Sequence, residues 1–162
     1  MTKQATKGAT AFQKPIVILD QCASRSESER IAAANGGRLM SVKEFILAIK
    51  DPTQYNRLKG DWYWTADIGL ELSGYCKIDY DNGAIVKVSE LEWEKLPYEQ
   101  RAYAHRGSGP VVFDVLYYLH RRLVVHALTR SDLAARVAYV GLEEAEAQGK
   151  TRKLLRMLGI KV

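Results

Sequence analysis

The chain has 162 residues, of which 47% are hydrophobic and 27% are charged, a composition typical of one ordinary globular domain. The two cysteines, Cys22 and Cys76, are too few for a disulfide framework and lack zinc-binding spacing, so we expect reduced thiols and a cytoplasmic location. A net charge of +5 slightly favours an anionic partner. No run reaches the roughly 18 apolar residues of a membrane span, so no membrane partner is expected.

The N-terminal quarter of the sequence predicts an arm, a strand and a helix. Residues 1–14 combine lysines with small residues and offer little to bury, which predicts a flexible arm. The β-branched run at 16–19 follows Pro15 and predicts a buried strand. Ser26 and Glu29 have the spacing of a capping box, so a first helix is expected to begin there and to end at the Asn-Gly-Gly that follows.

A second helix is predicted over 42–50. Ser41 and Glu44 have the S-x-x-E spacing of a capping box, in which each side chain accepts a hydrogen bond from the backbone of the other. Met40 and Phe45 flank this box and are placed to form a hydrophobic staple. The Asp-Pro pair after the helix is expected to stop it.

An aromatic strand is predicted at 62–65. Trp62 and Trp64 alternate with Tyr63 and Thr65, so the two indoles would lie on one face of the strand. Such a pair is more often part of a core than a sugar-binding platform. The core is therefore the preferred interpretation of the two tryptophans.

A β-hairpin is predicted over 75–88. A three-residue loop at 81–83, with Gly83 in the left-handed conformation, would gather apolar side chains on one face. The facing pairs would then be Tyr80–Ala84, Ile78–Val86 and Cys76–Val88. A two-residue Asn-Gly loop would scatter these side chains over both faces, so the three-residue loop is preferred. The acidic residues of the turn lack EF-hand spacing, and no calcium is expected.

A third helix is predicted, which Ser89 and Glu92 would cap and Pro97 would end. After this helix the charged residues change from mainly acidic to mainly basic. Between 101 and 136 lie all three histidines and six arginines, against two aspartates: His105, His120, His126, Arg101, Arg106, Arg121, Arg122, Arg130 and Arg136. Strands are expected over 111–117 and 122–128. In the second strand Leu123, Val125 and Ala127 would face inward, and Arg122, Val124 and His126 outward.

The C-terminal part is predicted to hold a strand at 137–140 and then a helix. Acidic residues precede basic ones in this segment, which suits a helix dipole. Its apolar stripe could pack on its own domain or on another copy of the chain, and the sequence favours neither: Leu154, Leu155, Met157 and Leu158.

The order of these elements resembles a known fold. A helix is followed by Gly-x-Arg-Leu-x-Ser-x-x-Glu-Phe at 36–45, by Trp-Tyr-Trp-Thr at 62–65 and by a late strand at 135–140. This order resembles the C-type-lectin-like fold, in the disulfide-free form of formylglycine-generating-enzyme-like domains and of the C-terminal domain of Legionella collagen-like protein. Phage tail proteins and retroelement variable proteins look like members of the same group. Met40 stands where those families usually have Pro.

The resemblance implies an α+β domain over 15–141, with two N-terminal helices packed on a twisted, mainly antiparallel sheet, and a helical extension over 142–162. The resemblance implies no catalytic or sugar-binding activity for this chain. The formylglycine-generating enzymes use a C-terminal cysteine pair, whereas no cysteine follows Cys76, and the sugar-binding motifs of C-type lectins do not occur. His120 and His126 would lie about 20 Å apart on an extended strand, too far to share a metal. We therefore expect no catalysis, no cofactor and no metal.

The function expected is that of a non-catalytic binding module for a protein or surface ligand, in the cytoplasm or, if the chain derives from a phage or prophage, in a virion. The partner expected is another protein or a second copy of this chain. The alternative is nucleic-acid binding, for example by a phage-encoded inhibitor of a nucleic-acid machine. Both would use the same tyrosine, histidine and arginine side chains: Tyr103, His105, Arg106, Tyr117, Tyr118, His120, Arg121, Arg122, His126 and Arg130. A solvated basic face without a ligand is the simpler interpretation and stays open.

Overall fold

The computed structural model describes residues 14–115, 123–128 and 133–142. Its elements in chain order are β1 (Ile16–Ala23), α1 (Arg25–Ala34), β2 (Gly37–Leu39), α2 (Val42–Ile49), α3 (Pro52–Leu58), β3 (Trp62–Leu70), β4 (Gly74–Asp79), β5 (Ala84–Lys87), α4 (Glu90–Lys95), the 3-10 turn η2 (Tyr98–Gln100), β6 (Arg101–His105), β7 (Gly107–Asp114), β8 (Leu123–Ala127) and β9 (Ala135–Gly141). The expected α+β class is thus confirmed. None of the helices in these ranges is long and apolar enough to cross a membrane.

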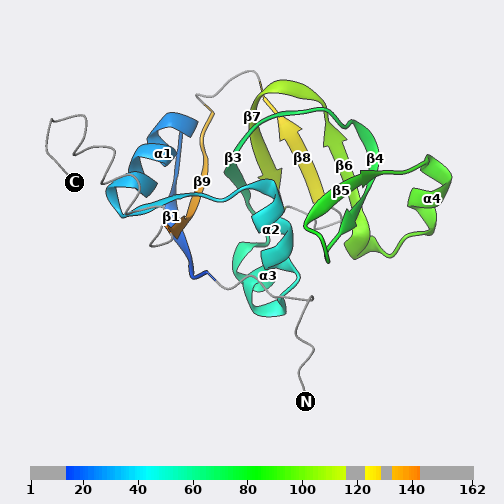
Figure 1. Ribbon diagram of the computed structural model, residues 1–162, viewed down its shortest axis with the longest axis horizontal. Coiled ribbons are helices and arrows are strands. Elements are labelled where there is room, and N and C mark those ends of the chain that lie inside the picture. Colours follow the sequence, from blue (N-terminus) through cyan, green and yellow to red (C-terminus); the bar gives the residue numbers. More distant parts are fainter. Residues whose placement is uncertain (1–13, 116–122, 129–132, 143–162) are drawn as a thin grey trace, which may run out of the picture.

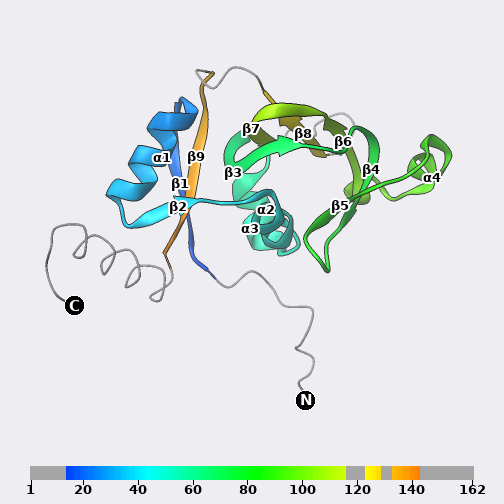
Figure 2. The same ribbon diagram turned by 45° about the horizontal axis from the view of Figure 1, so that its top comes forward.

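The strands form one mixed sheet in the order β1-β9-β3-β7-β8-β6-β4-β5, with β2 paired to β9 off this path. The β3–β9 and β6–β8 pairs are parallel and the other pairs are antiparallel, so the sheet is mainly antiparallel, as expected. Helix α1 lies beside β1 and β9 at one end of the molecule, and α4 lies at the other end (Figure 1). Helices α2 and α3 lie next to each other between these ends (Figure 2).

Strands β3 and β7 are buried on both faces where residues 63–65 of β3 lie beside residues 111–113 of β7. On one face Tyr63 and Phe113 pack in the larger hydrophobic cluster with Phe45 of α2, whose ring centroid is 5.5 Å from Tyr63 and 5.3 Å from Phe113. On the other face Trp64 and Val112 belong to a second cluster that includes Ala32 of α1. Because successive side chains of a strand point to opposite faces, α1 and α2 pack on opposite sides of these strands.

The core interpretation of the two tryptophans is confirmed. Trp64 is fully buried, and its indole Nε1 donates to the backbone oxygen of Ala23 at 2.9 Å. Trp62 is partly buried against the same cluster. The pair therefore stabilises the packing of β1 and α1 on the sheet.

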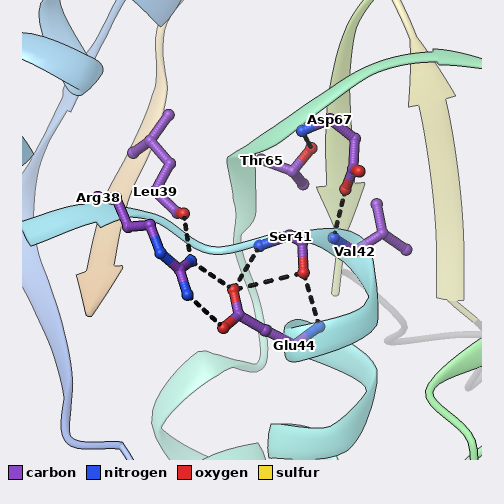
Figure 3. A network of polar contacts seen from close by, with 7 residues as sticks. All are labelled: Arg38, Leu39, Ser41, Val42, Glu44, Thr65 and Asp67. Atoms are coloured by element: carbon purple, nitrogen blue, oxygen red, sulfur yellow. Dashed lines mark hydrogen bonds and ion pairs between the residues drawn. The ribbon is translucent and has the colours of Figure 1, made fainter. Parts of the chain in front are cut away.

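The motif at 36–45 fixes how the chain enters α2 (Figure 3). Ser41 and Glu44 form the predicted capping box, and Arg38 donates to both carboxylate oxygens of Glu44 at 2.7 and 2.9 Å. The backbone N–H of Val42 donates to Asp67 of β3 at 2.6 Å. The first turn of α2 is thereby tied to β2 on one side and to β3 on the other. Met40 and Phe45, the predicted staple, are both fully buried in the larger cluster.

The predicted start of the first helix is wrong by two residues. Ser24 caps α1 by accepting from the backbone N–H of Glu27 at 3.3 Å, so the helix begins before Ser26. The carboxylate of Glu27 pairs with the guanidinium of Arg30. Two S-x-x-E spacings overlap in this segment, at 24–27 and at 26–29. The first, which directly follows β1, forms the cap.

Helix α3 was not predicted. Asp51 accepts from the backbone N–H of Thr53 at 2.9 Å, and Pro52 occupies the first helical turn, where a missing N–H costs nothing. The Asp-Pro pair therefore ends α2, as expected, and also begins the next helix. The segment 52–58 has only one fully buried apolar residue, Leu58, which is why no helical stripe is visible in the sequence.

The predicted hairpin register is wrong by one residue. Asp79 faces Ala84 and Ile78 faces Ile85, so the loop has four residues, 80–83, instead of three. The carboxylate of Asp79 accepts from the backbone N–H groups of Asp81 at 3.1 Å and Asn82 at 3.2 Å, which starts the turn one position earlier. Gly83 does adopt the predicted left-handed conformation, with φ of 64°.

The strand predicted at 16–19 is the first part of β1, but only Ile16 in it is buried, and Val17 is 38% exposed. The predicted arm lies outside the described residues except for residue 14. The other local predictions differ from the structure mainly at their ends. Ser89 and Glu92 form a complete capping box at the start of α4. The strand predicted over 111–117 begins earlier, at Gly107, and ends at Asp114. In β8 the predicted inward residues Leu123 and Val125 are buried. The predicted C-terminal helix and its apolar stripe, at 154–158, lie outside the described residues.

Candidate functional site

One face of strands β4, β6 and β8 carries side chains of a different kind from the other. On the side that packs in the larger cluster lie Cys76, Ala104 and Val125, each 0–1% exposed. The neighbouring positions along the same strands point the other way. That side, which we call the outer face, carries Tyr75 of β4, Tyr103 and His105 of β6, and His126 of β8.

The register of the sheet brings these four side chains into one row. Tyr75 pairs with Tyr103 across β4 and β6, and His105 pairs with His126 across β6 and β8. Ring centroids are separated by 5.6 Å from Tyr75 to Tyr103, by 5.0 Å from Tyr103 to His105 and by 4.5 Å from His105 to His126. The first contact is edge-to-face and the last is stacked, which are favourable geometries for aromatic pairs. We call Tyr75, Tyr103, His105 and His126 the aromatic row.

The aromatic row is partly open to solvent. His105 is exposed, and Tyr75, Tyr103 and His126 are half-buried. Trp93 of α4 packs on Tyr75 with 5.1 Å between ring centroids, but it is buried, and its indole donates to the backbone oxygen of Ala102 at 3.0 Å. Trp93 therefore packs against the Tyr75 end of the row, and the four rings of the row itself provide the surface.

The two ends of the row differ in charge. At the α4 end, the carboxylate of Glu90 is the largest influence on Tyr75 and raises the pKa of its phenol, with burial and Glu94 adding to the effect. At the other end, partial burial and the neighbouring imidazole of His126 lower the pKa of His105. His126 in turn lies 3.7 Å from the carboxylate of Asp114, and Arg106 is exposed directly after His105. The Tyr75 end of the row thus lies beside Glu90 and Glu94, whereas the histidine end has one carboxylate, Asp114, and one exposed arginine, Arg106.

The structure brings together part of the predicted site. Tyr103, His105 and His126 are in direct ring contact, and Arg106 follows them on the chain. The other predicted binding residues lie outside the described part of the chain, and so do the residues predicted for docking: Tyr117, Tyr118, His120, Arg121, Arg122, Arg130, Leu154, Leu155, Met157 and Leu158. For these residues the expectations stay predictions.

Two arginines of the basic stretch have structural roles. The guanidinium of Arg101 lies 4.6 Å from the ring centre of Trp93 and 4.7 Å from that of Tyr98, and it donates to backbone oxygens of the preceding segment. Arg136 forms an ion pair with Asp61 at 2.7 Å and donates to the backbone oxygen of Leu19. Both therefore hold neighbouring segments in place, and the solvated basic face is smaller than the sequence suggests.

Sequence reasoning missed Tyr75, which completes the row. The signal that could have found it is the alternation in β4, where Tyr75 must point away from Cys76 once that residue is placed in the core. That alternation does not tell which strand lies next to β4. The contact between Tyr75 and Tyr103 depends on the pairing of β4 with β6.

The described side chains are better suited to contact with a ligand than to catalysis. Cys76 is buried, and this burial raises the pKa of its thiol, which disfavours the reactive thiolate. Within the ranges that the structure covers, no three His, Cys, Asp or Glu side chains gather in a way that could hold a metal ion. What the aromatic row can offer is a rigid surface with hydrogen-bonding edges.

Comparisons with known proteins give one likeness. No protein-family model matches the sequence, and no curated protein matches it. Among solved structures, the chain is similar to TC14, a C-type lectin from the tunicate Polyandrocarpa misakiensis. The two chains are 15% identical, the alignment covers 82% of this chain and 100% of that one, and the TM-score is 0.40.

Proposed function

We propose that this chain is a non-catalytic binding module with a C-type-lectin-like core, and that its outer face contacts a protein ligand through the aromatic row. The supporting observation is the row itself: four rings in contact, partly exposed, on strands whose other face is packed core. Tyrosine combines a large rigid contact area with a hydroxyl group, and few rotatable bonds are immobilised when it binds. Such residues at the centre of an interface contribute a large share of the binding energy.

The charges around the row favour a protein over a nucleic acid. A nucleic-acid site neutralises phosphates with a continuous set of cations. Here Glu90 and Glu94 act on the Tyr75 end of the row, and the guanidinium of Arg101 is already placed between two aromatic rings. At the other end Asp114 adds a carboxylate beside His126, next to the exposed Arg106, and a protein surface can match such a mixture of charges. Nucleic-acid binding is kept as an outcome that the experiment can detect.

The test compares a double variant on the row with a control elsewhere on the sheet. Tyr103→Ala with His105→Ala removes two adjacent rings, whereas Ile68→Ala shortens an apolar side chain of β3 that is 62% exposed. The three proteins are immobilised and used to capture partners from a cell extract at low and moderate salt. Circular dichroism and urea unfolding verify that each variant is folded.

We expect a protein partner that binds the wild type and Ile68→Ala alike and that binds the double variant about 30-fold or more weakly, the loss typical of interface hot spots. A partner that binds all three proteins equally would exclude the aromatic row as the contact. Capture of nucleic acid alone, with affinity that falls steeply with salt, would replace the protein proposal with the nucleic-acid one.

A further inference from the structure

A pocket of about 410 Å³ lies between the end of α2, α3, the β4–β5 turn, η2 and β8. Its lining includes Ile49 and Lys50 at the end of α2, Tyr55 of α3, Tyr80 of the β4–β5 turn, Tyr98 of η2 and Leu123 of β8. Leu123 points into the larger cluster, on the side of β8 opposite His126. Small-molecule sites occupy roughly 300–1,000 Å³, so this pocket has room for a molecule with one ring and a short side chain.

The apolar part of the pocket is well fixed. Ile49 and Leu123 are 7% and 5% exposed and give it an aliphatic wall. The hydroxyl of Tyr80 donates to the backbone oxygen of Glu99, which holds its ring in place. Burial, with the charge of Glu99 adding to it, raises the pKa of Tyr80 to about 12, so this phenol stays neutral at ordinary pH. A planar ring would meet aliphatic and aromatic surface here.

The lining of the same pocket includes two residues of opposite charge, Lys50 and Glu99. The ammonium of Lys50 lies 3.3 Å from the carboxylate of Asp81, which is 83% exposed. Water competes for so open a pair, and it contributes little to stability, so the ammonium can turn to a ligand at small cost. Glu99 lines the pocket from η2 and brings a carboxylate. The described lining thus holds one cation and one anion around a ring-sized apolar space.

We infer that this pocket binds a small aromatic zwitterion of the amino-acid type. Its carboxylate pairs with Lys50, its ammonium pairs with Glu99, and its ring lies among the tyrosine, isoleucine and leucine side chains. A ligand with only one of these charges forms one ion pair with the pocket instead of two, so the zwitterion binds more tightly than either half of it. None of the four rings of the aromatic row is among the lining residues, and this inference does not depend on the function proposed for the outer face.

The test uses three probes on the full chain: phenylalanine, phenylacetate, which lacks the ammonium group, and phenethylamine, which lacks the carboxylate. Binding is followed by amide shifts in two-dimensional NMR, which also report where each probe binds. Lys50→Gln and Glu99→Gln remove one charge each with little change in shape. Lys59→Gln and Glu71→Gln, at exposed positions outside the pocket lining, make the same charge changes as controls.

We expect phenylalanine to shift the amides of Lys50, Tyr80 and Glu99 and to bind roughly tenfold more tightly than either half. Lys50→Gln should weaken phenylalanine and phenylacetate but not phenethylamine. Glu99→Gln should weaken phenylalanine and phenethylamine but not phenylacetate, and both controls should behave as the wild type. Absence of shifts at the pocket, equal binding of all three probes, or indifference of phenylalanine to both pocket variants would overturn the inference.

Discussion

The two faces of β4, β6 and β8 differ although they belong to the same strands. One face carries small and aliphatic side chains that are almost completely buried, such as Ala102, Ala104 and Val125. The other carries Tyr103 and His126, which are half-buried and in ring contact with their neighbours. The alternation of a β-strand thus separates the residues that stabilise the fold from those available to a ligand. Changes on the inner face should act on unfolding, and changes on the outer face should act mainly on binding.

The largest expected effect is on the packed side of the sheet. Phe113 is fully buried, and its ring stacks on Phe45 at 5.3 Å. Phe113→Ala should lower the free energy of unfolding by about 3–5 kcal/mol, because it removes buried apolar surface and leaves a cavity. Tyr103→Ala, on the outer face of nearby β6, should cost about 1 kcal/mol. Urea unfolding of both variants measures the difference, and equal losses would contradict the division between the two faces.

The next effect concerns Gly83, at which the β4–β5 turn comes close to Lys43 and Leu47 of α2. A Cβ at this position would lie 2.7 Å from Cγ of Lys43 and 3.0 Å from Cγ of Leu47, whereas one at Gly36 would meet nothing within 4 Å. Both glycines have positive φ, so alanine at either should cost about 1–2 kcal/mol in backbone strain. Gly83→Ala should cost about 1–3 kcal/mol more than Gly36→Ala, because of the clash. Equal costs would show that the turn can move away from α2.

A smaller effect is expected at the entry to α2. Burial alone would raise the pKa of Glu44, but hydrogen bonds from Arg38 and from the backbone of Ser41 outweigh it and hold the pKa below its usual value. The folded state therefore gains stability from this carboxylate above about pH 4.5, and loses it as the pH falls through the lowered pKa. Glu44→Gln should cost about 1–2 kcal/mol at pH 7 and almost nothing in strong acid.

Unfolding free energies of the wild type and Glu44→Gln between pH 2 and pH 8 test this dependence. The two curves should converge on the acid side. Glu71→Gln, which removes an exposed carboxylate, is the matched control and should run parallel to the wild type. A constant difference between the wild type and Glu44→Gln at every pH would show that the carboxylate charge is not what stabilises the cap.

The smallest effect is expected from the outer face itself. The pKa of His105 is lowered by burial and by His126, so the unfolded chain takes up a proton there before the folded chain does. Acidification from about pH 7 through the ordinary histidine range therefore lowers stability, until the lowered pKa is also passed. Replacing His105 with Gln should remove this part of the pH dependence, a change within about 0.5 kcal/mol at an exposed site. Calorimetry at pH 8 and pH 5 measures it, and an unchanged slope would contradict the role of the pair.

The sequence by itself determined the features that depend on residues close together in the chain. The capping boxes at Ser41 and Ser89 need only a carboxylate three positions later, and the left-handed turn needs Gly83. The inward positions of β8 follow from alternation within one strand. The α+β class was predictable through a resemblance, because the order of such local elements resembles that of the C-type-lectin-like fold.

Only the tertiary structure decided which of these elements meet. The hairpin register depended on the hydrogen bonds that the side chain of Asp79 accepts in the turn, and these are not visible in the apolar pattern of the strands. His105 and His126 are 21 positions apart and meet because β6 and β8 pair in parallel. The conformational energy of each strand by itself is nearly the same for any order of the strands in the sheet. That order is set by how all the elements together fill the two hydrophobic clusters. The aromatic row is therefore a product of the packing, although each of its residues can be identified in the sequence.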